Sequence, residues 1–174
     1  MYGSVDKQLM EERIEAYYRD KRSLEYNQHM LNMLHRHRQE AQRDIDNNNF
    51  HELEAELKGI AYDKDKVQTS AARSPQEQAL ENAFAKLERR VGEIDIEIIE
   101  TGQLIRDIEA RTADMEFLIN QLNDEARRFV EMRYRDNRSM KAIGHTISLS
   151  EMGLWRLREE LFRDISMWIS YKSC

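Results

Sequence analysis

Residues 91–122 read VGEIDIEIIETGQLIRDIEARTADMEFLINQL, and their apolar side chains recur with the heptad spacing of a coiled coil. Eight of the ten positions along this predicted seam are apolar, and the other two are threonine. We assign the coil and its oligomerisation to seven of them: Val91, Ile94, Ile98, Ile105, Ile108, Met115 and Ile119. The pattern predicts a long helix that packs one apolar edge against another helix.

A second long helix is predicted upstream, over residues 6–45, where apolar residues follow the three-four spacing of a helical stripe. Lys21 and Gln28 interrupt this stripe, so its seam should be the weaker of the two. The spacing leaves open whether the two helices pair within one chain or between copies. We expect both, in an antiparallel hairpin that also self-associates into a dimer or tetramer.

Between the two long helices, the asparagine run at 47–49 should end the first helix, and Asn49 should cap a short helix through Leu53, Leu57 and Ile60. Residues 61–74 have no apolar periodicity and are expected to form a loop. Ser74, Pro75 and Glu77 then have the order of a helix cap, a first helical proline and an acidic third position. The second long helix, of about 45 residues, should therefore begin at Pro75.

The composition narrows the fold class to all-α. Six glycines and one proline in 174 residues supply too few turns for a β-sandwich, a barrel or a doubly wound sheet. The single cysteine, Cys174, excludes an intrachain disulfide and a metal site built on thiolates. No apolar run has the length of a membrane span, and the first residues do not resemble a signal peptide, so we expect a cytoplasmic protein without membrane contact.

The balance between basic and acidic residues changes near residue 121. The whole chain has 27 basic and 33 acidic residues, whereas residues 122–174 have ten basic and eight acidic residues and both tryptophans. We therefore expect two parts, a helical coil and oligomerisation region over residues 1–121 and a different domain over residues 122–174.

The second part contains three apolar clusters of helix length. They are Ala126, Phe129, Val130 and Tyr134; Met140, Ile143 and Ile147; and Leu154, Leu157, Leu161 and Ile165. Asp136 and Asn137 should form the first turn between them, because asparagine tolerates a left-handed backbone. Residues 146–150 should form the second turn, with Ser150 as the cap of the third helix. Short helices joined by tight turns in this order indicate a helix-turn-helix.

Residues 122–161, LNDEARRFVEMRYRDNRSMKAIGHTISLSEMGLWRLREEL, resemble region 4 of the bacterial sigma-70 factors without a gap. The matching positions are Leu122, Arg127, Arg133, Tyr134, Ser139, Ile143, Ser150 and Leu154. Two positions depart from the family: Gly144 stands where it has alanine, and Ser148 where it has a turn glycine. Gly144 still permits close helix packing, whereas Ser148 would adopt a positive φ only at some cost.

With its coil and loop included, the chain is similar to phage and prophage regulators of late transcription of the ArpU/RinA type. That resemblance implies a DNA-binding activator of packaging and structural genes, with double-stranded DNA as its partner and host RNA polymerase or its sigma factor as a further contact. In a sigma-like domain the start of the third helix reads bases, and we assign this role to Ser150, Glu151, Met152, Trp155 and Arg156. We assign phosphate contacts to Arg138 and Lys141.

Two other functions remain open, a small-terminase-like subunit that recognises DNA for packaging, and a sigma-like adaptor that binds polymerase without reading DNA. An enzyme is not expected, because the chain has no glycine-rich phosphate loop and no nucleophile elbow. His35 and His37 face different sides of a helix, so we expect neither a metal nor a cofactor.

Overall fold

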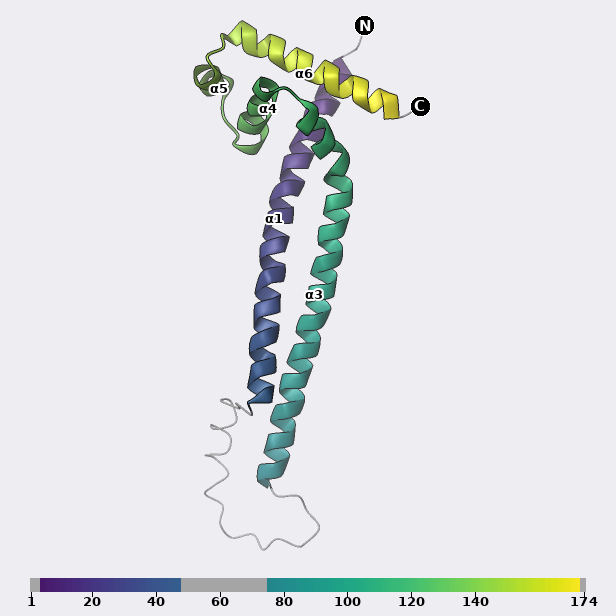
Figure 1. Ribbon diagram of the computed structural model, residues 1–174, viewed down its shortest axis with the longest axis vertical. Helices are drawn as coiled ribbons and strands as arrows, with labels where there is room; N and C mark the ends of the chain where they lie inside the picture. The colour runs from purple at the N-terminus through teal and green to yellow at the C-terminus, as the bar shows by residue number, and fades with distance from the viewer. Residues whose placement is uncertain (1–3, 48–74, 173–174) are drawn as a thin grey trace, which may run out of the picture. The chain divides into compact units, whose positions relative to one another are not determined.

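The computed structural model describes residues 4–47 and 75–172, and their regular structure is helical throughout, without a strand. Its elements are α1 (Ser4–Asp46), α3 (Pro75–Gln121), α4 (Asp124–Val130), the π-helix η1 (Glu131–Arg135), α5 (Met140–Ile147) and α6 (Glu151–Lys172) (Figure 1). The all-α fold class is therefore confirmed. The predicted short helix through Leu53, Leu57 and Ile60 and the predicted loop at 61–74 lie outside the described residues.

The two long helices have nearly the predicted bounds. We expected the first over residues 6–45, and α1 covers Ser4–Asp46. The second begins at Pro75, as predicted, and its 47 residues agree with the expected length of about 45. Its end at Gln121 coincides with the residue at which the charge balance changes.

By packing, the chain divides into two compact units. One contains Met1–Tyr26 and Ile105–Cys174, and the other contains Asn27–Leu104. The first unit thus combines the start of α1 with everything from the last turns of α3 onward, so its contacts cross residue 121. The functional division of the chain at residue 121 stays a prediction.

In the Asn27–Leu104 unit, the end of α1 packs against the start of α3. Leu34, Ala41 and Ile94 are buried, and Val91 and Ile98 are half-buried. The Nε atom of Arg38 lies 2.7 Å from Oδ1 of Asp95, which joins the two helices at their surface. Three of the predicted seam residues therefore face inward here.

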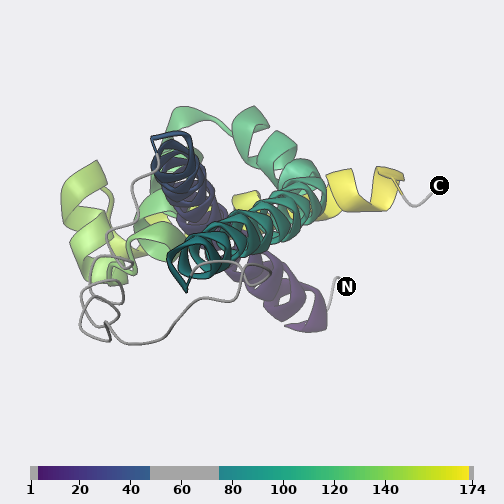
Figure 2. The ribbon, with the colours of Figure 1, turned by 90° about the horizontal axis from the view of Figure 1, so that it is seen from below.

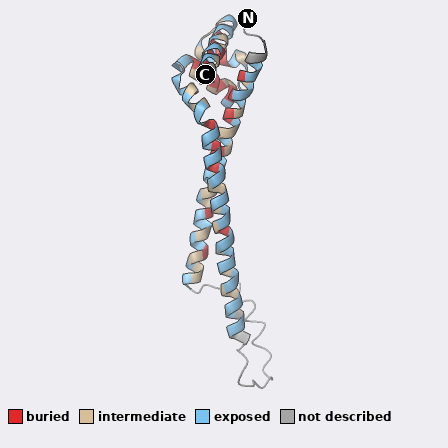
Figure 3. Cartoon of the chain, turned by 90° about the vertical axis from the view of Figure 1, so that its right-hand side faces the viewer, coloured by how far each residue is buried: buried red, intermediate tan, exposed pale blue. Residues whose placement is uncertain are grey.

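In the other unit, the seam continues along the last turns of α3. Ile105, Ile108 and Ile119 are buried and Met115 is half-buried, and the ribbon in Figure 3 is red at the buried positions of the long helices. Ion pairs of 2.8 Å join α1 to α3 here, between Asp20 and Arg111 and between Lys21 and Glu116. Lys21, which interrupts the apolar stripe of α1, thus has a partner on the facing helix. The two long helices contact each other within one chain in each unit.

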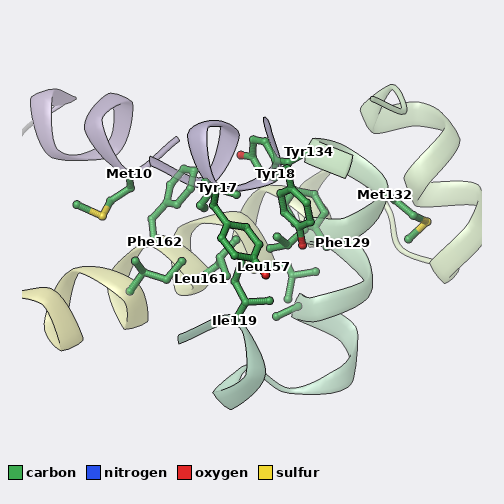
Figure 4. Packing of buried hydrophobic residues seen from close by; sticks show 14 of the residues in the cluster. Met10, Tyr17, Tyr18, Ile119, Phe129, Met132, Tyr134, Leu157, Leu161 and Phe162 are labelled. Atoms are coloured by element: carbon green, nitrogen blue, oxygen red, sulfur yellow. The ribbon is translucent and has the colours of Figure 1, made fainter. Parts of the chain in front are cut away.

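The main core lies in this same unit, where α4, η1, α5 and α6 pack against α1 and the end of α3. Its innermost side chains, each at most 1% exposed, include Ile14, Phe129, Val130, Ile143, Leu154, Leu161 and Ile165. Tyr17 and Tyr18 of α1 contribute to the cluster with Phe129 and Leu161 (Figure 4). The three apolar clusters predicted for residues 122–174 are therefore packed, and α1 supplies part of the core that covers them.

Two side chains form hydrogen bonds to the backbone where α3 ends and α4 begins. Arg127 donates from Nη2 to the carbonyl oxygens of Asn120 (2.8 Å) and Leu122 (3.3 Å), so a cation satisfies carbonyls at the end of α3. The Asn123 side chain accepts from the backbone N–H of Ala126 and caps α4. The helix then widens into η1, which the sequence did not predict.

Candidate nucleic-acid interface

Two serines cap the helices on either side of the turn between α5 and α6, and the cap at Ser150 is the one that the sequence predicts. Ser139 accepts from the backbone N–H of Ala142 at 3.3 Å and caps α5. Ser150 accepts from the backbone N–H of Gly153 at 3.1 Å and caps α6. Asn137 in the preceding turn has a φ of 54°, and Ser148 between the helices has a φ of 59°. The predicted turn at Asp136 and Asn137 is confirmed, whereas the second turn covers residues 148–150 and not 146–150, because α5 continues through Ile147. Ser148 adopts the left-handed backbone that favours glycine.

Close packing between α5 and α6 explains why residue 144 is a glycine. A Cβ atom at this position would lie 2.9 Å from the carbonyl oxygen of Leu149 and 3.2 Å from Cδ1 of Leu154. The Gly144 carbonyl oxygen also accepts a hydrogen bond from the Leu149 N–H at 3.0 Å, which closes the turn. The absent side chain therefore lets the turn and α6 approach the end of α5.

The two sides of α6 differ in exposure as the periodicity predicts. Leu154, Leu157, Leu161 and Ile165 are at most 7% exposed and belong to the core. Glu151, Met152, Trp155 and Arg156 are exposed, with 66% of Met152 and 54% of Trp155 accessible to solvent. The start of α6 therefore presents all four side chains away from the core, together with the exposed cap residue Ser150.

The two residues assigned to phosphate contacts lie at the start of α5, and both are exposed. Arg138 has one long ion pair, in which Nε lies 3.9 Å from Oδ2 of Asp136. In the part of the chain that the structure describes, neither Lys141 nor Arg156 has an ion-pair or hydrogen-bond partner. Two exposed cations are thus left free to contact an anion.

A shallow cleft of about 460 Å³ lies between α5 and the start of α6. Lys141 and Glu151, which were predicted as site residues, both line it, and so does His145. Sequence reasoning did not select His145, although its position four residues after Lys141 puts the two side chains on the same face of α5. The cleft therefore places the polar side chains of His145 and Ser148 beside the two predicted residues.

A polar network joins α1 to η1 and α6 beside the predicted reading residues. Glu11 accepts from the Tyr134 hydroxyl at 3.1 Å and from Nη2 of Arg158 at 2.7 Å. The Arg158 guanidinium also lies 5.4 Å from the ring centre of Trp155 and 5.1 Å from that of Phe162. Trp155 therefore has a structural partner as well as an exposed surface.

This network also changes the chemistry of the Tyr134 phenol. Burial raises its pKa, and the negative charge of Glu11 adds to the rise. A second ion pair also connects α1 with α6: the Lys7 ammonium contacts the Glu159 carboxylate. Sequence reasoning missed both contacts, because no local pattern relates residues near the start of the chain to residues near its end.

Comparison of the chain with protein-family models, with curated proteins and with solved structures finds no match. The resemblance to sigma region 4 and to the late-gene regulators therefore stays a prediction that rests on the residues themselves. Among the described residues, no helix combines the length and apolar character needed to cross a membrane, and no three histidine, cysteine or acidic side chains gather as a metal site.

Proposed function

We propose that this protein is a sequence-specific transcription regulator of phage or prophage origin, which binds double-stranded DNA through a sigma-like helix-turn-helix formed by α5 and α6. The observation that carries the proposal is the start of α6, where polar and apolar side chains are exposed above a fully packed inner face. An exposed, well-anchored helix with side chains of this kind fits the major groove of B-DNA.

Each exposed residue has a suitable chemistry for a base edge. Arg156 can donate two hydrogen bonds to a guanine, and Glu151 can accept one from the cytosine amino group. Met152 can contact a thymine methyl group, and Trp155 can do the same at the edge that Arg158 leaves open. The Ser150 hydroxyl is engaged in capping α6 as an acceptor, but its proton remains available to a nearby acceptor.

Phosphate contacts would come from the start of α5. Lys141 is exposed and free, Arg138 is held only by its long contact to Asp136, and both lie near the backbone N–H groups of the first turn. The excess of two positive charges over residues 122–174 is small for a DNA-binding domain. We therefore infer that binding is strengthened by self-association or by contact with RNA polymerase or its sigma factor.

The self-association part of the proposal needs a surface other than the seam. The seam residues of α3 are buried or half-buried within a single chain. In contrast, Ile96 and Ile99 are 58% and 68% exposed. A second copy would therefore bind through exposed residues of this kind. Light scattering of an Ile99→Asp variant against wild type tests this, because an unchanged mass in a self-associating wild type would exclude this surface.

The decisive experiment is DNA binding by matched charge variants. The wild-type protein is titrated against fragments tiled across its own genome neighbourhood, in about 150 mM salt with competitor DNA. For the fragment bound most tightly, Arg156→Ala should lose about 1 to 3 kcal/mol of binding free energy, while binding to unrelated DNA changes little. Arg22→Ala removes the same charge from an exposed position on α1 and should have no such effect.

Lys141→Ala separates phosphate contact from base reading. It should weaken binding to specific and unrelated DNA alike and reduce the salt slope of log K by about 1. Equal binding by wild type and Arg156→Ala would show that the reading residues are wrongly assigned. A salt slope near zero for every fragment would reject DNA binding and favour the adaptor that contacts polymerase alone.

A further inference from the structure

A second hollow lies in the unit formed by Met1–Tyr26 and Ile105–Cys174, apart from the predicted DNA-reading residues. It is a groove of about 550 Å³ between the end of α3, the start of α4 and the last turns of α6. Its apolar walls come from these helices and from the residue that follows α3: Leu118, Leu122, Ala126, Leu157, Leu161 and Ile165. On α6 the groove begins at Leu157, whereas the predicted reading residues end at Arg156.

Large apolar side chains remain exposed beside this groove. The rings of Phe117 and Trp168 meet edge to face with their centres 5.9 Å apart, yet the two residues are 53% and 47% exposed. Met167 lines the groove with Trp168 and is 59% exposed. Exposed large apolar side chains beside a groove, a tryptophan among them, are typical of protein interfaces.

The polar residues of the groove are acidic or uncharged. Glu160 and Asp164 lie one turn apart on α6, Gln121 and Asn123 come from the end of α3 and the residues after it, and among the side chains that the structure describes no lysine or arginine lines the groove. Within the described residues, neither Glu160 nor Asp164 has an ion-pair or hydrogen-bond partner. The groove thus carries two free carboxylates beside an apolar floor.

We propose that this groove binds an amphipathic helix of a partner protein, with large apolar side chains on one face and lysine or arginine residues along its flank. The apolar face would fill the groove against Leu118, Leu122 and Trp168, and the basic flank would pair with the carboxylates. The proposal goes beyond DNA binding and does not depend on it.

The negative charge of the groove disfavours two other occupants, DNA and a second copy of this chain. DNA phosphates would meet Glu160 and Asp164, and two like charges repel. A second copy bound groove to groove about a two-fold axis would place the Glu160 and Asp164 carboxylates of both copies in one apolar interface. A helix with lysine or arginine residues would instead attract the two carboxylates, so the repulsion expected for DNA and for a second copy does not arise.

The test uses the full chain and two labelled synthetic helical peptides. Both peptides have the same leucine and phenylalanine face; one has lysine and the other glutamate at every polar position. Fluorescence anisotropy should show the lysine peptide binding at least about tenfold more tightly than the glutamate peptide. Trp168→Ala should weaken the lysine peptide by about tenfold, because an aromatic anchor is lost from a half-exposed position that the fold can spare.

Reversing the charge of the two carboxylates tests their role, and the same reversal outside the groove is the matched control. Glu160→Lys with Asp164→Lys should invert the preference between the two peptides, since both residues are exposed and line the groove. Glu15→Lys with Glu109→Lys makes the same change in net charge at exposed positions outside the groove and should leave the preference as it is. Circular dichroism confirms that each variant is folded.

Three results would overturn the proposal. Equal binding of the two peptides would show that charge does not select the occupant. Inversion of the preference by the control pair as well would show that net charge acts without the groove. A wild-type dimer in light scattering that Trp168→Ala converts to a monomer would assign the groove to a second copy.

Discussion

The Tyr134 hydroxyl donates a 3.1 Å hydrogen bond to the Glu11 carboxylate, although 123 residues separate the two in the chain. Arg158 donates to the same carboxylate at 2.7 Å, so one acidic residue of α1 joins η1 and α6. Both ends of the Arg158 contact are about three-quarters shielded from solvent. A charge in this position stabilises the fold only while its partners are present, because an unpaired charge that water cannot reach is costly.

Loss of this carboxylate should therefore destabilise the protein. Glu11→Ala leaves the Arg158 guanidinium partly buried without its ion pair and should lower the free energy of unfolding by about 1 to 3 kcal/mol. Tyr134→Phe removes one hydrogen bond and leaves the ion pair, so about 1 kcal/mol is expected. Urea unfolding followed by circular dichroism measures both. Glu15→Ala, at an exposed position of α1, should change the unfolding midpoint little, and an equal loss in this control would contradict the role of the network.

Residues 122–174 should not fold by themselves. Met10, Ile14, Tyr17 and Tyr18 of α1 belong to the same core cluster as the buried residues of α4 and α6. A fragment of residues 122–174 would expose the apolar surface that these four side chains cover, and a small domain has little stability to lose. Its far-ultraviolet circular dichroism should show much less helix than the same residues have in the full chain. A cooperative thermal transition in the isolated fragment would instead support an independent domain with its boundary at residue 121.

Two glycines should respond in opposite ways to the same substitution. Gly144→Ala places a Cβ atom 2.9 Å from the backbone oxygen of Leu149, which cannot move without opening the turn. We expect a loss of about 1 to 3 kcal/mol in the free energy of unfolding. Gly92→Ala meets no atom within 4 Å and should stabilise α3 by up to about 1 kcal/mol, because alanine favours the helix. Thermal unfolding of the two variants side by side measures both, and a gain from Gly144→Ala would contradict the close approach of α5 and α6.

Local signals in the sequence account for the elements and their ends. The apolar repeat predicts α3 and its inward side chains, Pro75 marks its start, and Ser150 caps α6. Asn137 has the left-handed backbone for which asparagine is suited. Each of these features depends on residues within a few positions of one another, and that is the range over which caps, turns and helical periodicity act.

The features that the sequence did not predict depend on distant parts of the chain. Glu11 is one of several acidic residues on α1, and its neighbours in the sequence do not distinguish it from the others. Only the folded chain, in which α6 lies close to α1, shows its role. The exposure of Trp168 and the free carboxylates of Glu160 and Asp164 likewise follow from how α6 lies against α3 and α4. Periodicity separates the inner from the outer face of a helix, but it does not identify which neighbour covers the inner face or leaves a groove open.

Stability should fall at alkaline pH because of buried tyrosines. Burial raises the pKa of Tyr17, Tyr18 and Tyr134 above the ordinary value of about 10. The folded state therefore keeps these phenol protons where the unfolded chain loses them, so the contribution of these tyrosines to stability is constant below about pH 10 and falls above it. Urea midpoints at about pH 8 and about pH 11 should show this loss, and Tyr18→Phe should reduce it. Tyr26→Phe, at a residue 62% exposed, is the matched control. An unfolding midpoint that does not change between the two pH values, or an equal effect of both substitutions, would show that burial of the phenols does not govern alkaline stability.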